Sequence, residues 1–391
     1  MSHLLRAIIP GMEQTITIDF ERQKKAKEYA RISRRLMLVD LALGGAYVLA
    51  WLVFGWSADL KQWLTGLTPN SWLLVAFYAA IFGGIYLLVN LPISFYEEFV
   101  LPHRYDQSNQ DLKGWIGDQI KGLLVSAVLG GALLEIIYAV LRAFPDTWWL
   151  WAAGILLIFS VLLANLAPVL LYPIFYKFIP LEMEHADLAE RLTRLAKRAH
   201  TKVQGVYKFD MSRRTKSANA ALTGLGNSRR IILGDTLINE FSTDEIETVL
   251  AHELGHQVNR DITLGIMIQT VLTLVGLYLA SVGLRWGVGI FGFSGPADVA
   301  ALPLFALVIG AYGLVTLPAT NAFSRWRERR ADEYALKSTG NGKAFASAFA
   351  RLANQNLADA DPEPWVEFLL YSHPALSKRI QKAEKFERTK I

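Results

Sequence analysis

Long apolar stretches recur along the chain, and each is long enough to cross a bilayer as a helix, which takes about 20 mainly apolar residues. We interpret six stretches in this way. The fourth carries Pro168 and Pro173, which predict a kink or a break. The six predicted spans are residues 36–55, 72–95, 120–141, 148–175, 264–284 and 299–323. The pattern therefore predicts a mainly α-helical, polytopic membrane protein.

Two long polar regions interrupt this pattern. The first is an insert at 180–262 between the fourth and fifth spans, and the second follows the sixth span at 324–391. They leave an N-terminal region at 1–179 with four spans and a pair of spans at 263–323. We expect the two polar regions to form an α+β domain.

The insert carries signals for a hairpin and for a capped helix. Extended runs at 217–223 and 230–233 flank a Gly-Leu-Gly-Asn turn, a pattern that is typical of a β-hairpin. This hairpin could equally be purely structural. Ser242 and Glu245 form a capping-box pattern, so a helix should begin there and continue to about Asn259.

The positive charges orient the predicted spans. Of the 40 Lys and Arg residues, Lys61, Arg142 and Arg285 are the three that fall in the short connections on one side. Arginine-rich flanks before the first span and after the sixth agree, and such flanks usually face the cytosol. Both termini and both polar regions are therefore predicted to be cytosolic.

Composition narrows the possible chemistry. Hydrophobic residues make up 52% of the 391 positions and charged residues 19%, values that lie toward the membrane class. The formal net charge of +5 mostly reflects the positive flanks, and no nucleic-acid-binding motif accompanies it. The absence of cysteine excludes thiolate ligands and a cysteine nucleophile. Any bound metal must therefore use histidine and carboxylate ligands.

The sequence His-Glu-Leu-Gly-His at 252–256 lies on the predicted capped helix. Residues four apart share one helix face, so His252 and His256 can reach the same ion. Zinc suits such a site because it accepts nitrogen and oxygen ligands and keeps a position open for water. Glu253 lies beside that face and is placed to act as general base. The alternative is a pair of surface histidines at a helix end.

A third ligand is expected from the segment that follows the sixth span. Glu328 lies there, while the His-Glu-x-x-His motif precedes the fifth span, so two spans packed as a hairpin would bring both to one membrane face. Asp332 is four residues further along the same helix face and could orient a ligand histidine through its outer nitrogen. Exchanged roles for Glu328 and Asp332, or a Glu328 solvated among arginines, are the alternatives.

A later run at 372–379 contains further candidates. His373 and Arg379 are residue types that can donate hydrogen bonds to the oxyanion of a tetrahedral intermediate. A single histidine next to proline is also often structural.

These motifs together resemble one known family. The chain contains HELGH at 252–256, ERRADEYA at 328–335, SANAALTG at 217–224 and SHPALSKR at 372–379, with further similarity at 21–30 and 96–105. Their order is similar to that of the integral-membrane CAAX prenyl protease family, type 1, a gluzincin group of zinc endopeptidases. The resemblance covers most of the chain, and the catalytic half carries the more specific motifs.

The resemblance implies a role for each matching residue. His252, His256 and Glu328 look like the ligands of one zinc ion and Glu253 like the catalytic base. His373 and Arg379 look like the donors near the transition state. Asn219 and Ala220 look like the edge strand that pairs with the substrate. The family encloses a large chamber with its membrane helices. Eukaryotic members have seven spans, and we expect this chain to lack the first, which favours a prokaryotic inner membrane over the endoplasmic reticulum.

We therefore expect a membrane-embedded zinc metalloendopeptidase that acts on protein or peptide substrates, with membrane lipid around it. The resemblance implies removal of a C-terminal tripeptide from prenylated proteins. An alternative is a quality-control protease without prenyl specificity. An alternative of another class is a transporter or scaffold that binds metal without catalysis.

Overall fold

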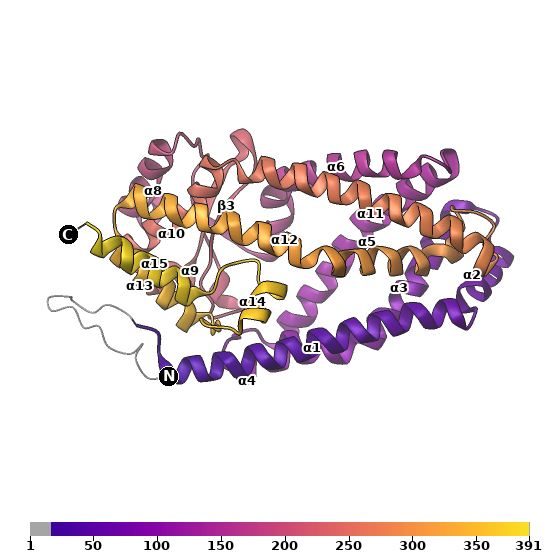
Figure 1. The fold of residues 1–391 in the computed structure, drawn as a ribbon, viewed down its shortest axis with the longest axis horizontal. Coiled ribbons are helices and arrows are strands. Elements are labelled where there is room, and N and C mark those ends of the chain that lie inside the picture. The colour runs from indigo at the N-terminus through magenta and orange to yellow at the C-terminus, as the bar shows by residue number, and fades with distance from the viewer. Residues whose placement is uncertain (1–16, 391) are drawn as a thin grey trace.

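The computed structural model describes residues 17–390, and within them six helical segments are long and apolar enough to span a membrane. This confirms the expected number of spans. The six candidate spans are Phe20–Val53, Ser71–Arg104, Leu112–Ala143, Trp148–Phe175, Asp261–Phe291 and Val299–Thr339. Several run beyond the apolar stretches predicted from the sequence. These helices therefore extend from the apolar bundle into the polar part of the molecule (Figure 1).

The surface of the bundle is apolar, as expected where lipid replaces water as the solvent. Val315 is 80% exposed and Leu88 71% exposed, and both belong to candidate spans. The helices of the N-terminal half are α1 (Phe20–Val53), α2 (Trp56–Leu67), α3 (Ser71–Phe95), α4 (Leu101–Arg104), α5 (Leu112–Ala143), α6 (Trp148–Leu166) and α7 (Tyr172–Phe175).

Two of the spans change their winding near one end. A π-helical turn at Tyr96–Val100 joins α3 to α4, and a second at Ala167–Leu171 joins α6 to α7. The second turn contains Pro168, which cannot donate the usual helical hydrogen bond. The fourth span, for which the prolines predicted a kink or a break, is thus a continuous helical segment with a π-helical turn, while the turn in the second span was not anticipated.

The end of the bundle remote from the sheet is closed by polar contacts. Lys61 of α2 donates a 2.6 Å hydrogen bond to Asp298, a buried residue that caps the turn before α12 (Leu302–Thr339). Ser57 of α2 bonds to Tyr78 of α3 and to the carbonyl of Ala300. These contacts connect α2 with both α3 and the sixth span.

A four-stranded sheet lies at the opposite end of the molecule. Its strands are β1 (Phe178–Pro180), β2 (Val206–Phe209), β3 (Ala220–Thr223) and β4 (Arg230–Gly234), in the order β1-β2-β4-β3. Strands β3 and β4 pair antiparallel, which confirms the hairpin, whereas β2 and β4 pair parallel. Because β1 lies at 178–180, the sheet includes residues on both sides of the boundary expected at 179.

Helices cover this sheet and form one core with it. The helices of this part are α8 (Ala186–Arg198), α9 (Asp235–Glu240), α10 (Thr243–Val258), α13 (Gly342–Gln355), α14 (Pro364–Leu370) and α15 (Leu376–Arg388). Buried side chains from both polar regions, such as Leu192, Leu254 and Phe345, belong to the same hydrophobic cluster. Figure 1 shows the C-terminal helices in yellow packed beside the sheet and α10.

The helix that carries the His-Glu-x-x-His motif begins as the sequence predicts. Ser242 accepts a hydrogen bond from the backbone N–H of Glu245, and the Glu245 carboxylate accepts one from Ser242 in return. This capping box starts α10 at Thr243, and the helix ends at Val258. After Asn259 and Arg260, the chain enters α11 (Asp261–Phe291), so α10 leads almost directly into the fifth span.

Candidate metal centre

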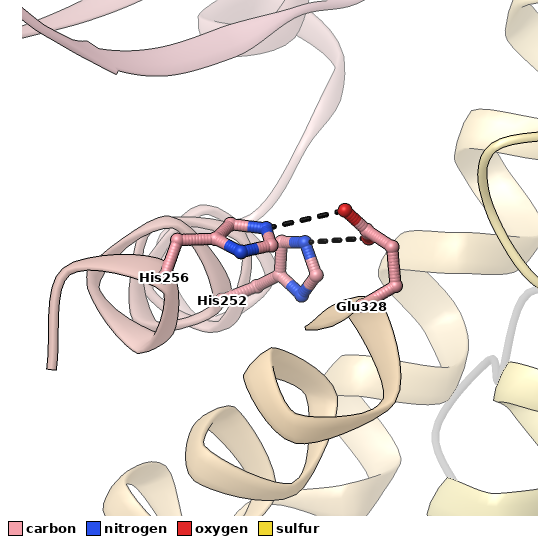
Figure 2. Close-up of side chains that lie close together, drawn as sticks. All are labelled: His252, His256 and Glu328. Carbon is pink, nitrogen blue, oxygen red and sulfur yellow. Dashed lines mark ion pairs between the residues drawn. The ribbon is translucent and has the colours of Figure 1, made fainter. Parts of the chain in front are cut away.

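Helices α10 and α12 approach closely at the proposed site because a glycine lies between them. A Cβ atom at Gly255 would come within 2.9 Å of the Cα atom of Ala331. Only hydrogen fits there, so the two helix backbones can meet. Figure 2 shows the result: His252 and His256 project from one helix toward Glu328 on another.

The ring nitrogens of both histidines point at the carboxylate of Glu328. His252 Nε2 lies 3.2 Å from Glu328 Oε2, and His256 Nε2 lies 3.3 Å from Glu328 Oε1 (Figure 2). One ligand atom from each of the three residues lies within 4.8 Å of the others. Side chains separated by about seventy positions therefore meet at one point, as the sequence analysis expected of two spans folded as a hairpin.

The outer nitrogens of the two rings are also occupied by carboxylates. His252 Nδ1 lies 2.9 Å from Asp332 Oδ1, and His256 Nδ1 lies 2.9 Å from Asp261 Oδ2. Both aspartates are buried. An imidazole that donates its Nδ1–H to a carboxylate presents a lone pair at Nε2, so both rings are arranged to bind a cation.

The donor set fits a tetrahedral zinc ion. Zinc–ligand bonds of about 2.0–2.1 Å place neighbouring ligand atoms about 3.3 Å apart, close to the separations of Glu328 from the two rings. Glu328 Oε2 is buried and has no hydrogen-bond partner among the described residues. A buried carboxylate oxygen without a donor is costly, and a bound cation would satisfy it.

The charges of the site favour a cation. Burial and the guanidinium of Arg379 lower the pKa of His252, but the neighbouring carboxylates of Asp332 and Glu328 outweigh them and raise it to about 9. The carboxylate of Glu328 faces the Nε2 atoms of both histidines. The side chains alone therefore attract protons, for which a metal ion would substitute.

The candidate catalytic residues lie at different places around this cluster. Glu253 is half-buried on α10 and forms no side-chain hydrogen bond or ion pair within residues 17–390. His373 is 59% exposed, and its Nε2 lies 3.4 Å from Glu328 Oε1. The side chain of His373 is thus more accessible than that of Glu253.

Arg379, the second candidate donor to the oxyanion, is buried beside the cluster, and its Nη2 lies 3.8 Å from Glu328 Oε2. It is 5% exposed and packs over the ring of Phe349. Its Nε and Nη2 atoms donate to the two carboxylate oxygens of Asp332 at 3.0 and 2.5 Å. Nη2 also lies 3.2 Å from His252 Nδ1. The guanidinium therefore holds Asp332 behind His252 instead of facing open space.

Strand β3 forms the edge of the sheet nearest to α10. The N–H of Gly234 bonds to the carbonyl of Asn219, so the backbone of Asn219 faces β4. Since antiparallel pairs alternate, the backbone groups of Ala220 and Leu222 face the opposite way, outward. Within residues 17–390, the outward backbone groups of Ala220 form no backbone hydrogen bond, and the side chain of Asn219 is exposed.

Two parts of this site were not anticipated from the sequence. Asp261 was overlooked because it lies outside the motif, although its position five residues after His256 is a usable signal. Asn356 was overlooked as well. Its side chain bonds to both the N–H and the carbonyl of Ala218, at 2.7 and 3.1 Å, and so occupies the β3 edge beside its free part.

Comparison with known proteins identifies the family. Residues 182–387, more than half of the chain, match the description "Peptidase family M48". Residues 5–177 match "CAAX prenyl protease N-terminal, five membrane helices". Four of the six candidate spans lie in the described part of that second region.

Individual relatives and one solved structure agree. The chain is 30% identical to the uncharacterized metalloprotease YhfN of Bacillus subtilis, over 93% of this chain and 85% of the relative. It is 29% identical to CAAX prenyl protease 1 of Saccharomyces cerevisiae, over 93% of this chain and 86% of the relative.

The crystal structure of S. mikatae Ste24p superimposes with a TM-score of 0.84 at 26% identity, covering 96% of this chain and 92% of that chain. The chain therefore belongs to peptidase family M48, as an integral, multi-pass membrane metalloprotease of the CAAX prenyl protease 1 type.

Proposed function

We propose that this protein is a zinc endopeptidase whose metal is bound by His252, His256 and Glu328. The observation that carries the proposal is the convergence of two imidazole Nε2 atoms on the buried carboxylate of Glu328, whose Oε2 has no hydrogen-bond partner within residues 17–390. Nitrogen and carboxylate oxygen at tetrahedral spacing suit zinc. The transporter or scaffold alternative does not account for membership of a metallopeptidase family.

Each residue of the site then has a task in peptide hydrolysis. Zinc held there would polarise the scissile carbonyl and make water acidic enough to serve as nucleophile. Glu253 takes the proton from the attacking water and passes it to the leaving amine. The exposed ring of His373 donates to the oxyanion. Arg379 and Asp332 act behind His252 and keep its ring in place.

The substrate backbone would bind to strand β3. The outward N–H and carbonyl groups of Ala220 and Leu222 can pair with an extended peptide, which is β-augmentation and needs little side-chain specificity. Strand β3 packs beside α10, which carries both histidines. A peptide on this edge therefore runs alongside the helix that holds the metal ligands.

The proposed clients are prenylated proteins at the cytosolic face of the membrane. Relatives from yeast and plants are named CAAX prenyl protease 1 or its homologue. The positive flanks of the first and sixth spans favour a site on the cytosolic side. A second candidate, degradation of unmodified and loosely folded membrane proteins, rests on the open and sequence-tolerant edge of β3.

The catalytic step is tested by Glu253→Gln. This change removes the proton acceptor but none of the proposed ligands, so cleavage should fall by at least about 100-fold. Zinc content, measured by mass spectrometry of the purified protein, should remain at one ion per chain. Glu240→Gln, an exposed change at the end of α9, serves as control and should alter neither quantity. Full activity in the Glu253→Gln protein would refute the mechanism.

The client is tested by direct competition. A farnesylated peptide and the same peptide without the prenyl group are offered to the purified enzyme together with an unmodified, loosely folded polypeptide. A kcat/KM at least tenfold higher for the farnesylated peptide supports CAAX-type processing. Equal rates on all three substrates would favour the quality-control function. A chelator should stop every reaction, and zinc should restore it.

A further inference from the structure

The turn between α10 and α11 has an unusual backbone. Helix α10 ends at Val258 and α11 begins at Asp261, so Asn259 and Arg260 alone separate the two helices. The second, Arg260, has a φ of 57°, a left-handed conformation that side chains other than glycine rarely adopt. Strained backbone of this kind persists where the surrounding structure requires it, often at functional sites.

This turn places Asp261 beneath a proposed metal ligand. The residue is 1% exposed, and its Oδ2 lies 2.9 Å from His256 Nδ1. The other carboxylate oxygen, Oδ1, has no hydrogen-bond partner among the described residues; the nearest cation is Arg330 Nη1 at 3.7 Å. Within the described residues, Oδ2 of this buried carboxylate therefore contacts the imidazole of His256, and Oδ1 forms no hydrogen bond.

Helix α12 holds the turn from the other side. Arg327 Nη1 donates to the backbone carbonyl of Asp261 at 3.2 Å, and Arg330 Nη2 donates to Asn259 Oδ1 at 3.2 Å. Both arginines flank Glu328 in the sequence. The helix that supplies the carboxylate ligand thus also fixes the turn that supports His256.

We infer that Asp261 is a positioning residue for His256. Its carboxylate accepts the Nδ1–H of the ring, which fixes the tautomer that presents the Nε2 lone pair to the metal. Asp332 stands in the same relation to His252, so each proposed histidine ligand has its own buried carboxylate. This inference rests on the metal site of the proposed function, and it adds a residue outside the zinc-binding motif.

A purely structural role is the competing explanation. Asp261 is the first residue of α11, where a negative charge interacts favourably with the helix dipole. That role depends on charge, whereas orientation of the ring depends on a hydrogen-bond acceptor. Asparagine removes the charge and keeps the acceptor, so Asp261→Asn separates the two explanations, and Asp261→Ala removes both features.

The test measures metal binding to the purified full-length protein by competition with a chromogenic chelator. We expect Asp261→Ala to weaken zinc affinity by about 10- to 100-fold, the usual effect of losing such a partner, and Asp261→Asn to stay within about threefold of wild type. The visible spectrum of the cobalt-substituted protein should change in Asp261→Ala and not in Asp261→Asn. A purely structural role would leave that spectrum unchanged.

Asp298→Ala is the matched control. Asp298 is also a buried aspartate just ahead of a span, where it accepts a hydrogen bond from Lys61 of α2. Its loss should lower the melting temperature and leave zinc affinity unchanged. The inference is overturned if Asp261→Ala binds zinc within threefold of wild type, or if Asp261→Asn is as weak as Asp261→Ala. A wild-type protein that binds no zinc would instead refute the proposed function itself.

Discussion

At the scale of single residues, the segment that carries His373 is held by one carboxylate. Glu367 accepts a hydrogen bond from the backbone N–H of Ala375 at 3.2 Å and one from Lys378 Nζ at 2.5 Å. Arg325 bonds to the carbonyl of Tyr371 on the other side of the segment. His373 therefore lies between Tyr371 and Ala375, whose backbone groups are both hydrogen-bonded to side chains.

This arrangement predicts a pH dependence. Burial raises the pKa of Glu367, but the bonds from Lys378 and Ala375 outweigh it and lower the pKa below its ordinary value of 4.5. A lowered folded-state pKa means that the ionised form stabilises the fold above pH 4.5. This contribution is lost as the pH falls below that value through the folded-state pKa. Hydrogen exchange of peptides covering 371–376, corrected for intrinsic rates, should therefore rise at pH 4 relative to pH 7.

Replacing Glu367 by Gln should produce faster exchange already at pH 7 and remove most of the pH dependence. Glu363→Gln, an exposed change nearby, is the control and should behave as wild type. Equal protection of the segment in the Glu367→Gln and wild-type proteins would contradict this account.

The sequence specified the site at this scale only in part. The two histidines and Glu253 are contiguous, and Glu328 directly follows a span, so local pattern and hydropathy were sufficient to pair them. The spacing of Asp261 from His256 is a local signal, but its contact also depends on Arg260 taking a left-handed conformation that glycine or asparagine would have signalled. The contact of Arg379 with Asp332 depends on the packing of α15, which no local pattern reveals.

At the scale of elements, the approach of α10 to α12 depends on Gly255. In Gly255→Ala, the new methyl group would meet the backbone of Ala331 at 2.9 Å, and backbone cannot rotate away. We expect a loss of about 1–3 kcal/mol in stability and zinc affinity at least tenfold weaker, because Glu328 moves away from both histidines. Thermal unfolding and chelator competition measure the two effects.

Another helical glycine provides the comparison. Gly313 lies on α12 with no atom within 4 Å of its ideal Cβ position. Gly313→Ala should retain metal affinity and gain up to about 1 kcal/mol from helix propensity. If both alanine variants bound zinc like wild type, the close helix contact would not be what brings the ligands together.

The edge strand gives a second prediction at this scale. Ala220→Pro removes an N–H that faces outward, so the hydrogen bonds between β3 and β4 remain intact. Peptide cleavage should fall about tenfold in kcat/KM, while the melting temperature changes little. Ala220→Ser retains the N–H and should cleave normally. Unchanged cleavage by the proline variant would exclude pairing of substrate at this residue.

At the scale of the whole molecule, the polar domain is joined to the bundle by an ion pair between Asp118 of α5 and Arg214 of the insert. Arg214 Nε and Nη2 donate to the two carboxylate oxygens at 2.6 and 3.0 Å, and the guanidinium stacks over Tyr176. Both side chains are largely buried. The ion pair therefore helps to hold the polar domain in a fixed position relative to the helical bundle.

Breaking the pair should loosen the domain against the bundle. Asp118→Asn and Arg214→Met should each lower stability by about 1–3 kcal/mol. The double variant should lose less than the sum, because the contact is shared. Apparent melting temperatures in detergent measure the effects. The exposed pair of Glu333 and Lys337 should show no measurable coupling. Strict additivity at Asp118 and Arg214 would argue against the contact.

The overall architecture divides in the same way into predictable and unpredictable parts. Hydropathy located all six spans because apolar length is a property of the local sequence. No local sequence pattern signals the parallel pairing of β2 with β4. Nor does one signal that the three-residue strand β1, which ends in a proline, pairs with β2. The polar contacts of α2 at the end of the bundle were also not predicted, because they depend on Asp298 and Lys61, which lie more than two hundred positions apart.

The bond between Asn356 and Ala218 limits what the edge strand can offer a client. With the backbone of Ala218 already engaged, the outward groups of Ala220 and Leu222 are what remains of β3 for an incoming chain. So short a contact gives weak attachment to any single polypeptide. If substrates bind at this edge, the turnover rate should depend less on their binding affinity than on their concentration in the surrounding bilayer.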